Sequence, residues 1–174
     1  LDTWLRIELI RHQVRLSNAI GLGASATLVF LIFWFGPHLN HWSEYIWLLG
    51  LGLVRIPAIL QARRFEQASA DEKLRSVRRF RLHNAIAGLC WAWGAATMFA
   101  FHDTPEQWMF VAVFCGIGAA ATTTQAAIHG SAFVFLAPTL LTLAIGLSLQ
   151  GDAQSLTLLA LMPIYSIALV LLHR

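Results

Sequence analysis

The chain has 174 residues, of which 57% are hydrophobic and only 12% are charged, and its mean hydropathy is positive. Soluble domains are about half apolar and about a quarter charged, so this composition excludes an ordinary water-soluble domain and indicates a chain built for lipid. The two cysteines, Cys90 and Cys115, fall inside apolar runs, which predicts no disulfide framework. At roughly 20 residues per span the length accommodates about six membrane helices and leaves no room for a soluble catalytic domain.

The first 15 residues mix apolar and charged side chains. Apolar residues such as Trp4 are interleaved with charged residues such as Arg6 and Glu8. This pattern is typical of an amphipathic helix that lies in a membrane interface. We therefore predict a cytoplasmic interfacial helix over residues 1–15, followed by one membrane domain over residues 16–174.

Six apolar stretches follow, and they predict an all-α, polytopic membrane protein. The predicted spans cover residues 16–35, 44–61, 82–101, 107–127, 131–149 and 156–172. The polar segment between the second and third stretches, residues 62–81, is predicted to be the longest loop.

The basic residues indicate the orientation of these spans. Three arginines precede the first span, seven Lys or Arg residues fill segment 62–81, and Arg174 follows the last span. The predicted loops 36–43, 102–106 and 150–155 contain no Lys or Arg. The positive-inside rule therefore predicts that both termini lie in the cytoplasm, in a multi-pass protein of the bacterial inner membrane.

Small residues recur at helical spacing in the third and fourth predicted spans. They are Asn84, Gly88, Ala92 and Ala96 in the third, and Ala112, Gly116, Ala120 and Thr123 or Thr124 in the fourth. Small side chains let two helix backbones approach closely. We therefore predict that these two spans form a tightly packed pair.

Arg55 lies inside the second predicted span, about 12 Å along the helix from its cytoplasmic end at Arg63. An arginine at that depth costs a few kcal/mol unless another group satisfies it. Polar residues predicted at a similar depth are Asn18, His83, Asn84, Thr123 and Gln125.

These residues support two interpretations. In one, Arg55 extends toward lipid phosphate and the other polar side chains cap helix ends. In the other, they form a polar pocket in which Arg55 binds an anionic amphiphile, with the tail among Trp91, Trp93 and Phe110.

A second group of polar residues lies near the opposite membrane edge. His38, His41 and Glu44 fall at three-residue spacing, and the neighbouring predicted loops contain His102, Asp103, Glu106 and Asp152. Histidine with carboxylate can bind a divalent transition metal. Ordinary loop polarity explains these residues equally well, so both interpretations stay open.

Motifs for catalysis are absent from the sequence. It has no Gly-x-Ser-x-Gly, no His-Glu-x-x-His, no phosphate-binding glycine-rich loop and no pair of intramembrane carboxylates. A transporter is expected to place acidic sites at the midplane, often within inverted repeats, and neither signal appears. We therefore predict no enzymatic activity, no catalytic residue, no cofactor and no nucleic-acid partner for these residues.

The arrangement resembles the membrane-embedded input regions of bacterial sensor proteins. The resemblance rests on the charged interfacial start, six short-looped spans, the run Arg81-Leu82-His83-Asn84 with Gly88 and Trp91, and Leu149-Gln150-Gly151-Asp152 before the last span. Such regions precede histidine-kinase, hybrid-kinase or diguanylate-cyclase output domains, and some detect diffusible fatty-acid or ketone signals in quorum sensing.

The resemblance implies a homodimeric sensory domain in contact with membrane lipids and a small amphipathic ligand. We accordingly expect the polypeptide to continue after Arg174 into an output domain, because the last span ends on the cytoplasmic side. Alternatives left open are the input domain of a diguanylate cyclase or phosphodiesterase, a small permease or channel, and a passive membrane anchor.

Overall fold

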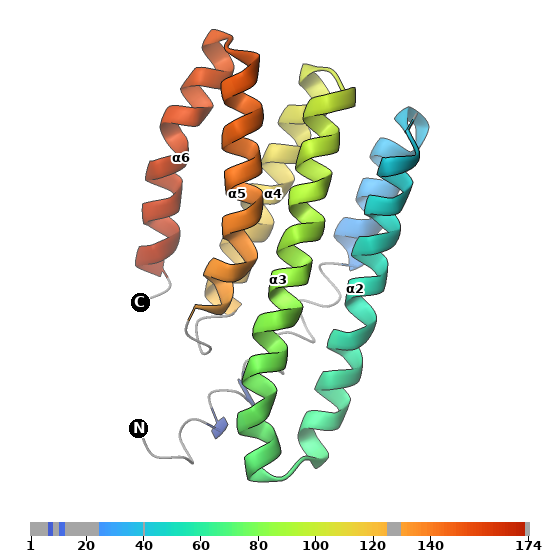
Figure 1. Cartoon of the computed structure of the whole chain (residues 1–174), viewed down its shortest axis with the longest axis vertical. Coiled ribbons are helices and arrows are strands. Elements are labelled where there is room, and N and C mark those ends of the chain that lie inside the picture. Colours follow the sequence, from blue (N-terminus) through green and yellow to red (C-terminus); the bar gives the residue numbers. More distant parts are fainter. Residues whose placement is uncertain (1–6, 9–10, 13–24, 40, 125–129, 173–174) are drawn as a thin grey trace.

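The computed structural model describes residues 7–8, 11–12, 25–39, 41–124 and 130–172 (Figure 1). Within these ranges every regular element is a helix, which confirms the predicted all-α class. The elements are the helical segment Ser25–Phe35, the 3-10 helix η1 (Gly36–His38), and the α-helices α2 (Trp42–Gln67), α3 (Ala70–Phe101), α4 (Thr104–Thr124), α5 (Ser131–Gln150) and α6 (Ala153–Leu172).

The described part of the N-terminal region is small. Residues 7–8 and 11–12 are helical, and the Arg11 guanidinium forms an ion pair with Glu8. The other residues of the predicted interfacial helix, and residues 16–24 of the first predicted span, lie outside the described part.

The helices run side by side along the long axis of the molecule (Figure 1). The α3–α4 turn, the α5–α6 turn and η1 lie at the same end of the molecule, and we call this the His102 end (Figure 1). At the other end α2 and α3 are joined by a turn at Ala68 and Ser69, and we call this the hairpin end.

Segment 62–81 is helical, and its prediction as a long loop was wrong. α2 continues to Gln67 and α3 begins at Ala70, so only two residues separate them. Ser69 begins α3 with a capping box, in which its N–H donates to Glu72 Oε2 over 2.9 Å and the Glu72 N–H donates back to Ser69 Oγ over 3.4 Å. Figure 1 shows this two-helix hairpin extending well beyond the ends of α4, α5 and α6.

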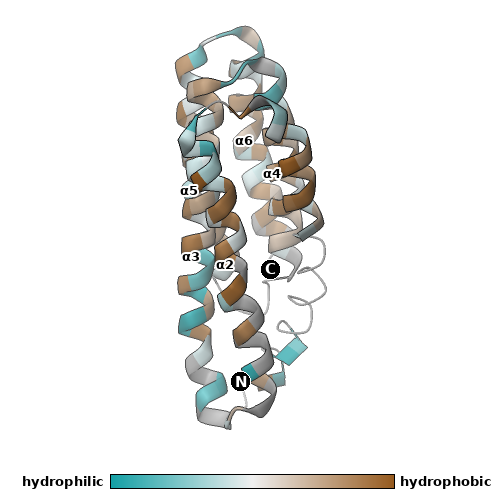
Figure 2. Ribbon diagram, turned by 90° about the vertical axis from the view of Figure 1, so that its right-hand side faces the viewer, coloured by the Kyte–Doolittle hydropathy of each residue, from teal (hydrophilic) through white to brown (hydrophobic). Residues whose placement is uncertain are grey.

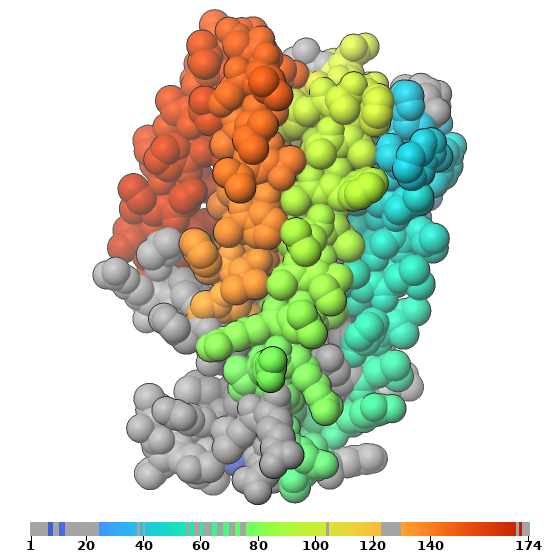
Figure 3. All heavy atoms as spheres, in the orientation of Figure 1, coloured from blue at the N-terminus to red at the C-terminus, as the bar shows by residue number. Residues whose placement is uncertain are grey.

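The closest helix pair is α3 with α5, so the predicted pairing of the third and fourth spans was also wrong. Gly88 of α3 lies against the backbone of Phe135, where an added Cβ would approach the carbonyl oxygen to 2.3 Å. The small residues Ala112, Gly116 and Ala120 of α4 are instead exposed, and nothing lies within 4 Å of a Cβ built on Gly116. α3 and α5 run parallel and are neighbours on the face shown in Figure 3.

Among the described residues, two helices are long and apolar enough to cross a membrane. They are the Ser76–Phe101 part of α3 and the whole of α5, Ser131–Gln150. Shorter apolar helices cover Ser25–Phe35, Trp42–Val54 and Ala153–Leu169. Figure 2 shows apolar residues along α4, α5 and α6 and hydrophilic residues along the part of α3 that forms the hairpin.

Candidate functional site

Most of the predicted ligand pocket lies outside the described residues. Asn18 and Gln125 are among the residues that the structure does not describe, as are the side chains of Arg55 and Thr123. The backbone of Arg55 belongs to α2 and that of Thr123 to α4. The structure therefore leaves the pocket as a prediction.

The height of Arg55 along the bundle follows from the contacts between α2 and α3. A Cβ built on Gly50 would lie 3.7 Å from Cys90 Sγ, so these two residues face each other. Because the two helices are antiparallel, the fifth residue after Gly50 lies level with the fifth residue before Cys90 (Figure 1). Arg55 is therefore level with Ala85 and adjacent in height to Asn84, where α5 begins, rather than deep among the helices.

Asn84 connects two helices. Its amide Nδ2 donates a hydrogen bond to Oγ of Ser131, the first residue of α5, and both residues are buried. One turn further along, the buried Thr139 hydroxyl donates to the Gly88 carbonyl over 3.1 Å. Asn84 therefore ties α3 to α5, whereas the neighbouring His83 is half-buried.

The three aromatic residues predicted to surround a ligand tail occupy different environments. Trp91 is buried, and its ring centroid lies 6.3 Å from that of Trp47 and 5.8 Å from that of Phe110. Phe110 and Phe114 are fully buried in the same cluster, which fills the space between α2, α3 and α4. Trp93 is 49% exposed and points elsewhere, with its indole N–H donating to the Ser43 carbonyl over 3.3 Å.

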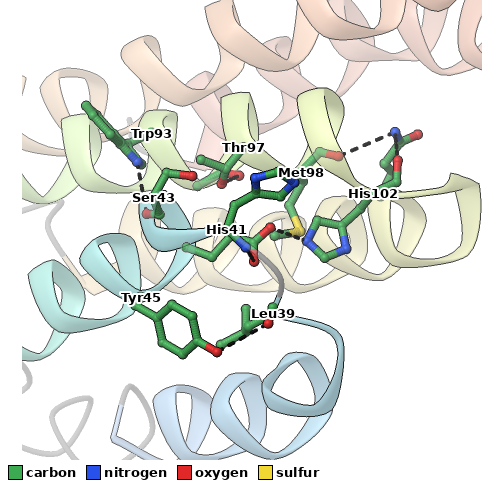
Figure 4. A network of polar contacts seen from close by, with 11 residues as sticks. Leu39, His41, Ser43, Tyr45, Trp93, Thr97, Met98 and His102 are labelled. Atoms are coloured by element: carbon green, nitrogen blue, oxygen red, sulfur yellow. Dashed lines mark hydrogen bonds and ion pairs between the residues drawn. The ribbon is translucent and has the colours of Figure 1, made fainter.

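The residues named for a metal site have other partners. Glu44 is fully buried, its Oε1 lies 2.6 Å from Nε2 of the buried His102, and its Oε2 accepts the backbone N–H of His41 over 3.2 Å (Figure 4). The His41 ring is stacked on Phe101, with ring centroids 3.9 Å apart. Among the described residues no three His, Cys, Asp or Glu side chains gather where they could hold a metal ion, and the side chain of His38 lies outside that part.

A continuous chain of polar contacts crosses the His102 end of the bundle. Glu44 of α2 contacts the ring of His102, which directly follows α3. The backbone carbonyl of His102 accepts a hydrogen bond from Gln107 Nε2 of α4 over 2.7 Å. Gln150 of α5 donates to the side-chain oxygen of Gln107, and Ser155 of α6 donates to Gln150 Oε1 over 2.8 Å. We call these residues, together with Asp152, the inter-helix network.

Asp152 completes this network at the start of α6. Its Oδ1 accepts the Ser155 N–H over 2.9 Å, and its Oδ2 lies 2.7 Å from the Ser155 hydroxyl, whose single proton is shared between Asp152 and Gln150. These two hydrogen bonds to the charged form lower the pKa of Asp152 below its ordinary value. Gly151, with a positive φ of 67°, ends α5 directly before it.

Sequence reasoning missed the inter-helix network as a unit. It considered Glu44, His102 and Asp152 as metal ligands or ordinary loop polarity. It quoted Gln150 only as part of the run before the last span, and it did not single out Gln107 or Ser155. A usable signal was present, because each of these polar residues lies within three residues of a helix end on the same side of the predicted bundle. Helix ends on one side are the places where side chains from several helices can meet.

Comparison with known proteins gives no relative for this chain: no family model matches it, and neither a curated protein nor a solved structure shows significant similarity.

Proposed function

We propose that this chain is the membrane-embedded input domain of a bacterial signal-transduction protein. It detects a hydrophobic or amphipathic small molecule, such as a fatty-acid-like signal, and passes a conformational change through α6 to a histidine-kinase output domain. In this proposal six helices span the inner membrane with both termini in the cytoplasm, and the chain acts as a homodimer.

The exposed surface of the helices supports immersion in lipid. Large apolar side chains point outward over much of the described surface, among them Phe33 at 83% and Leu149 at 82% exposure. Only 39% of the most apolar stretch is buried in each of α3 and α5, whereas a core helix of a soluble protein is mostly buried. Outward-facing apolar residues at this density suit hydrocarbon rather than water.

The inter-helix network is the observation that carries the sensory function. It links α2, α3, α4, α5 and α6 at one end of the bundle. Polar contacts between membrane helices are few and specific, so rearranging one of them gives discrete alternative states of the bundle. A ligand that prefers one of these states shifts the population of the whole bundle.

The attachment of α6 supports its role in transmission. Its described contacts are with α4 and α5. Besides Ser155 at one end, the phenol of Tyr165 donates to the Cys115 carbonyl of α4 over 2.7 Å. Because α6 makes few polar contacts with its neighbours, a change at Ser155 tilts or rotates it. Pro163 lies between the contacts at Ser155 and Tyr165.

A permease is less well supported than a sensor. The aromatic cluster around Trp47, Trp91 and Phe110 fills the space between α2, α3 and α4, where a substrate path through these helices would have to run. In the sensory proposal the ligand approaches from the lipid, and Arg55 is the counter-ion for its anionic group.

The experiment joins the full chain after Arg174 to the dimeric output module of a histidine kinase, in membranes. A panel of long-chain fatty acids and alkyl ketones is added, and autophosphorylation is measured. We expect at least one amphiphile to change the kinase activity. We expect Arg55→Gln to abolish the response to acids, whereas the control substitution Lys73→Gln in the hairpin, whose ammonium lies over the Phe65 ring, leaves it intact.

Two outcomes would contradict the proposal. One is a kinase response to amphiphiles that is unchanged after the whole bundle is replaced by an unrelated membrane anchor. The other is uptake of the amphiphile into proteoliposomes by the chain alone, which would favour a permease.

A further inference from the structure

The part of α2 and α3 that extends beyond the other helices is strongly basic. Between residues 62 and 81 there are seven Lys or Arg residues and three Asp or Glu residues, giving a formal charge of +4 from 7 minus 3. We call this segment the basic hairpin. It is a packed unit, because Phe65 and Phe80, on its two helices, are 3% and 6% exposed.

Three arginines of the basic hairpin are exposed and have no ionic or hydrogen-bond partner in the described part of the chain. The side chains of Arg64, Arg78 and Arg79 face outward, and none of them forms an ion pair or hydrogen bond with another described residue. The nearby Lys73 differs from them, because its ammonium lies over the Phe65 ring, 5.5 Å from the centroid.

Their heights place these arginines just beyond the apolar bundle. The bond between Asn84 and Ser131 marks the level at which α5 begins. At about 1.5 Å per residue, Arg79 lies about 7.5 Å and Arg78 about 9 Å beyond that level. Arg64, nine residues after Arg55 on α2, lies about 12 Å beyond it.

These heights match the polar layer of a bilayer. The headgroups add roughly 5–7 Å on each side of the hydrocarbon core, and charges interact over a Debye length of about 8 Å at physiological ionic strength. All three guanidinium groups are thus within reach of lipid phosphates if the apolar bundle spans the membrane. An acidic protein fits this position less well than a lipid, because it would have to reach arginines that lie directly at the lipid surface.

We propose that Arg64, Arg78 and Arg79 form a binding site for anionic phospholipid headgroups at the neck of the basic hairpin. The proposal rests on the membrane placement given under the proposed function and adds a defined lipid class to it. Guanidinium groups bind phosphate through paired N–H donors, so the site distinguishes lipids with net negative charge from zwitterionic lipids. Occupation by such lipids holds the hairpin in a fixed orientation relative to the membrane plane.

The test uses the full chain in detergent micelles with fluorescent phosphatidylglycerol and phosphatidylcholine as probes. We expect the chain to bind phosphatidylglycerol more tightly and to lose that preference at high salt. Each arginine contributes about fivefold in affinity, so R64Q/R78Q/R79Q weakens binding by roughly a hundredfold. The control Lys73→Gln has a much smaller effect, because that ammonium is already held at Phe65.

Three results would overturn the proposal. They are unchanged phosphatidylglycerol binding by the triple variant with its helical content intact, an equal loss with Lys73→Gln, and displacement of the lipid by an equal concentration of soluble glycerol phosphate. The outcome is independent of signalling. A chain that responds to amphiphiles without preferring phosphatidylglycerol contradicts the lipid site alone, and the reverse result contradicts the sensor alone.

Discussion

The carboxylate of Glu44 is fully buried next to the imidazole of His102, and this pair determines how the His102 end of the bundle responds to mutation. In His102→Ala the buried Oε1 atom of Glu44 loses this partner, while Oε2 keeps the hydrogen bond from the His41 N–H. Because a buried polar atom left without its partner costs about 1–3 kcal/mol, we expect His102→Ala to reduce the free energy of unfolding by about that amount. Unfolding in mixed detergent micelles, followed by circular dichroism, measures this change.

A second variant separates charge from packing at the same site. In Glu44→Gln/His102→Ala the buried group is a neutral amide, so the double variant should be more stable than His102→Ala alone. The control Gln154→Ala, at an exposed position of the same end of the bundle, should change stability by less than about 0.5 kcal/mol. Equal stability of the single and double variants would mean that the charge of Glu44 is unimportant.

The lowered pKa of Asp152 predicts that the stability of the fold depends on pH in the acid range. Its pKa in the folded protein is lowered by the two hydrogen bonds from Ser155, so it releases its proton more readily in the fold than in the unfolded chain. Its stabilising effect is therefore complete above the unfolded pKa of about 3.9 and is lost as the pH falls through the lower, folded value. Asn is an equally good N-cap without the charge, so Asp152→Asn should keep α6 and lose this dependence.

The difference between the thermal unfolding temperatures of the wild type and Asp152→Asn, followed from about pH 6 to pH 2, isolates this group from the other carboxylates. We expect the wild-type advantage to disappear in the acid range. A constant difference over the whole range would show that the hydrogen bonds from Ser155 do not stabilise the charged form.

At the scale of the elements, the contact between α3 and α5 is the most sensitive to added volume. A Cβ on Gly88 would lie 2.3 Å from the Phe135 carbonyl oxygen, which forces the two backbones apart. We expect Gly88→Ala to destabilise the bundle by about 1–3 kcal/mol. The same substitution at Gly116, where nothing lies within 4 Å, should be neutral or stabilise α4 by up to about 1 kcal/mol.

The opposite signs of these two effects are measured by unfolding both variants under the same conditions. If Gly116→Ala proved the more damaging variant, the α4 stripe rather than α3 with α5 would be the tight interface. That result would restore the helix pairing indicated by the small-residue pattern of the sequence.

The sequence predicted the positions of the helices better than it predicted which helices pack against each other. Apolar run length locates α4, α5 and α6 to within three residues at each end, because hydrophobicity over such a length specifies a helix. It failed for residues 62–81, where high polarity indicated a loop although the Ser69 and Glu72 capping box and a run of good helix formers favour helix. It also failed for pairing, because a small-residue stripe such as Ala112 to Ala120 does not specify which helix it faces.

The candidate site was predictable only in part for a related reason. Unusual single residues are visible in a sequence, so Arg55, Glu44 and His102 were all noted. Partnerships between residues far apart in the chain, such as Asn84 with Ser131 or Gln107 with Gln150, depend on helix rotation and register, which the hydrophobic pattern does not fix. The inter-helix network is therefore visible only in the three-dimensional structure, whereas its individual carboxylates are visible in the sequence.

At the scale of the whole molecule, the two ends of the bundle carry opposite charge character. The hairpin end holds the seven basic residues of segment 62–81, and the His102 end, with Glu44, Asp103, Glu106 and Asp152, has no Lys or Arg in its turns. Moving a cluster of arginines across a bilayer is far costlier than leaving them in the cytoplasm. The proposed orientation therefore puts the turn at Ala68 inside the cell and the turn at Asp103 outside it.

This orientation is tested by cysteine labelling in intact cells, after Cys90 and Cys115 have been replaced by alanine. Asp103→Cys should react with a membrane-impermeant maleimide added outside, because Asp103 is exposed in the α3–α4 turn. Ala68→Cys should react only with a permeant reagent or after the membrane is opened. Labelling of Ala68→Cys from outside would reverse the topology, remove the basic hairpin from the cytoplasmic leaflet, and leave α6 pointing away from any cytoplasmic kinase.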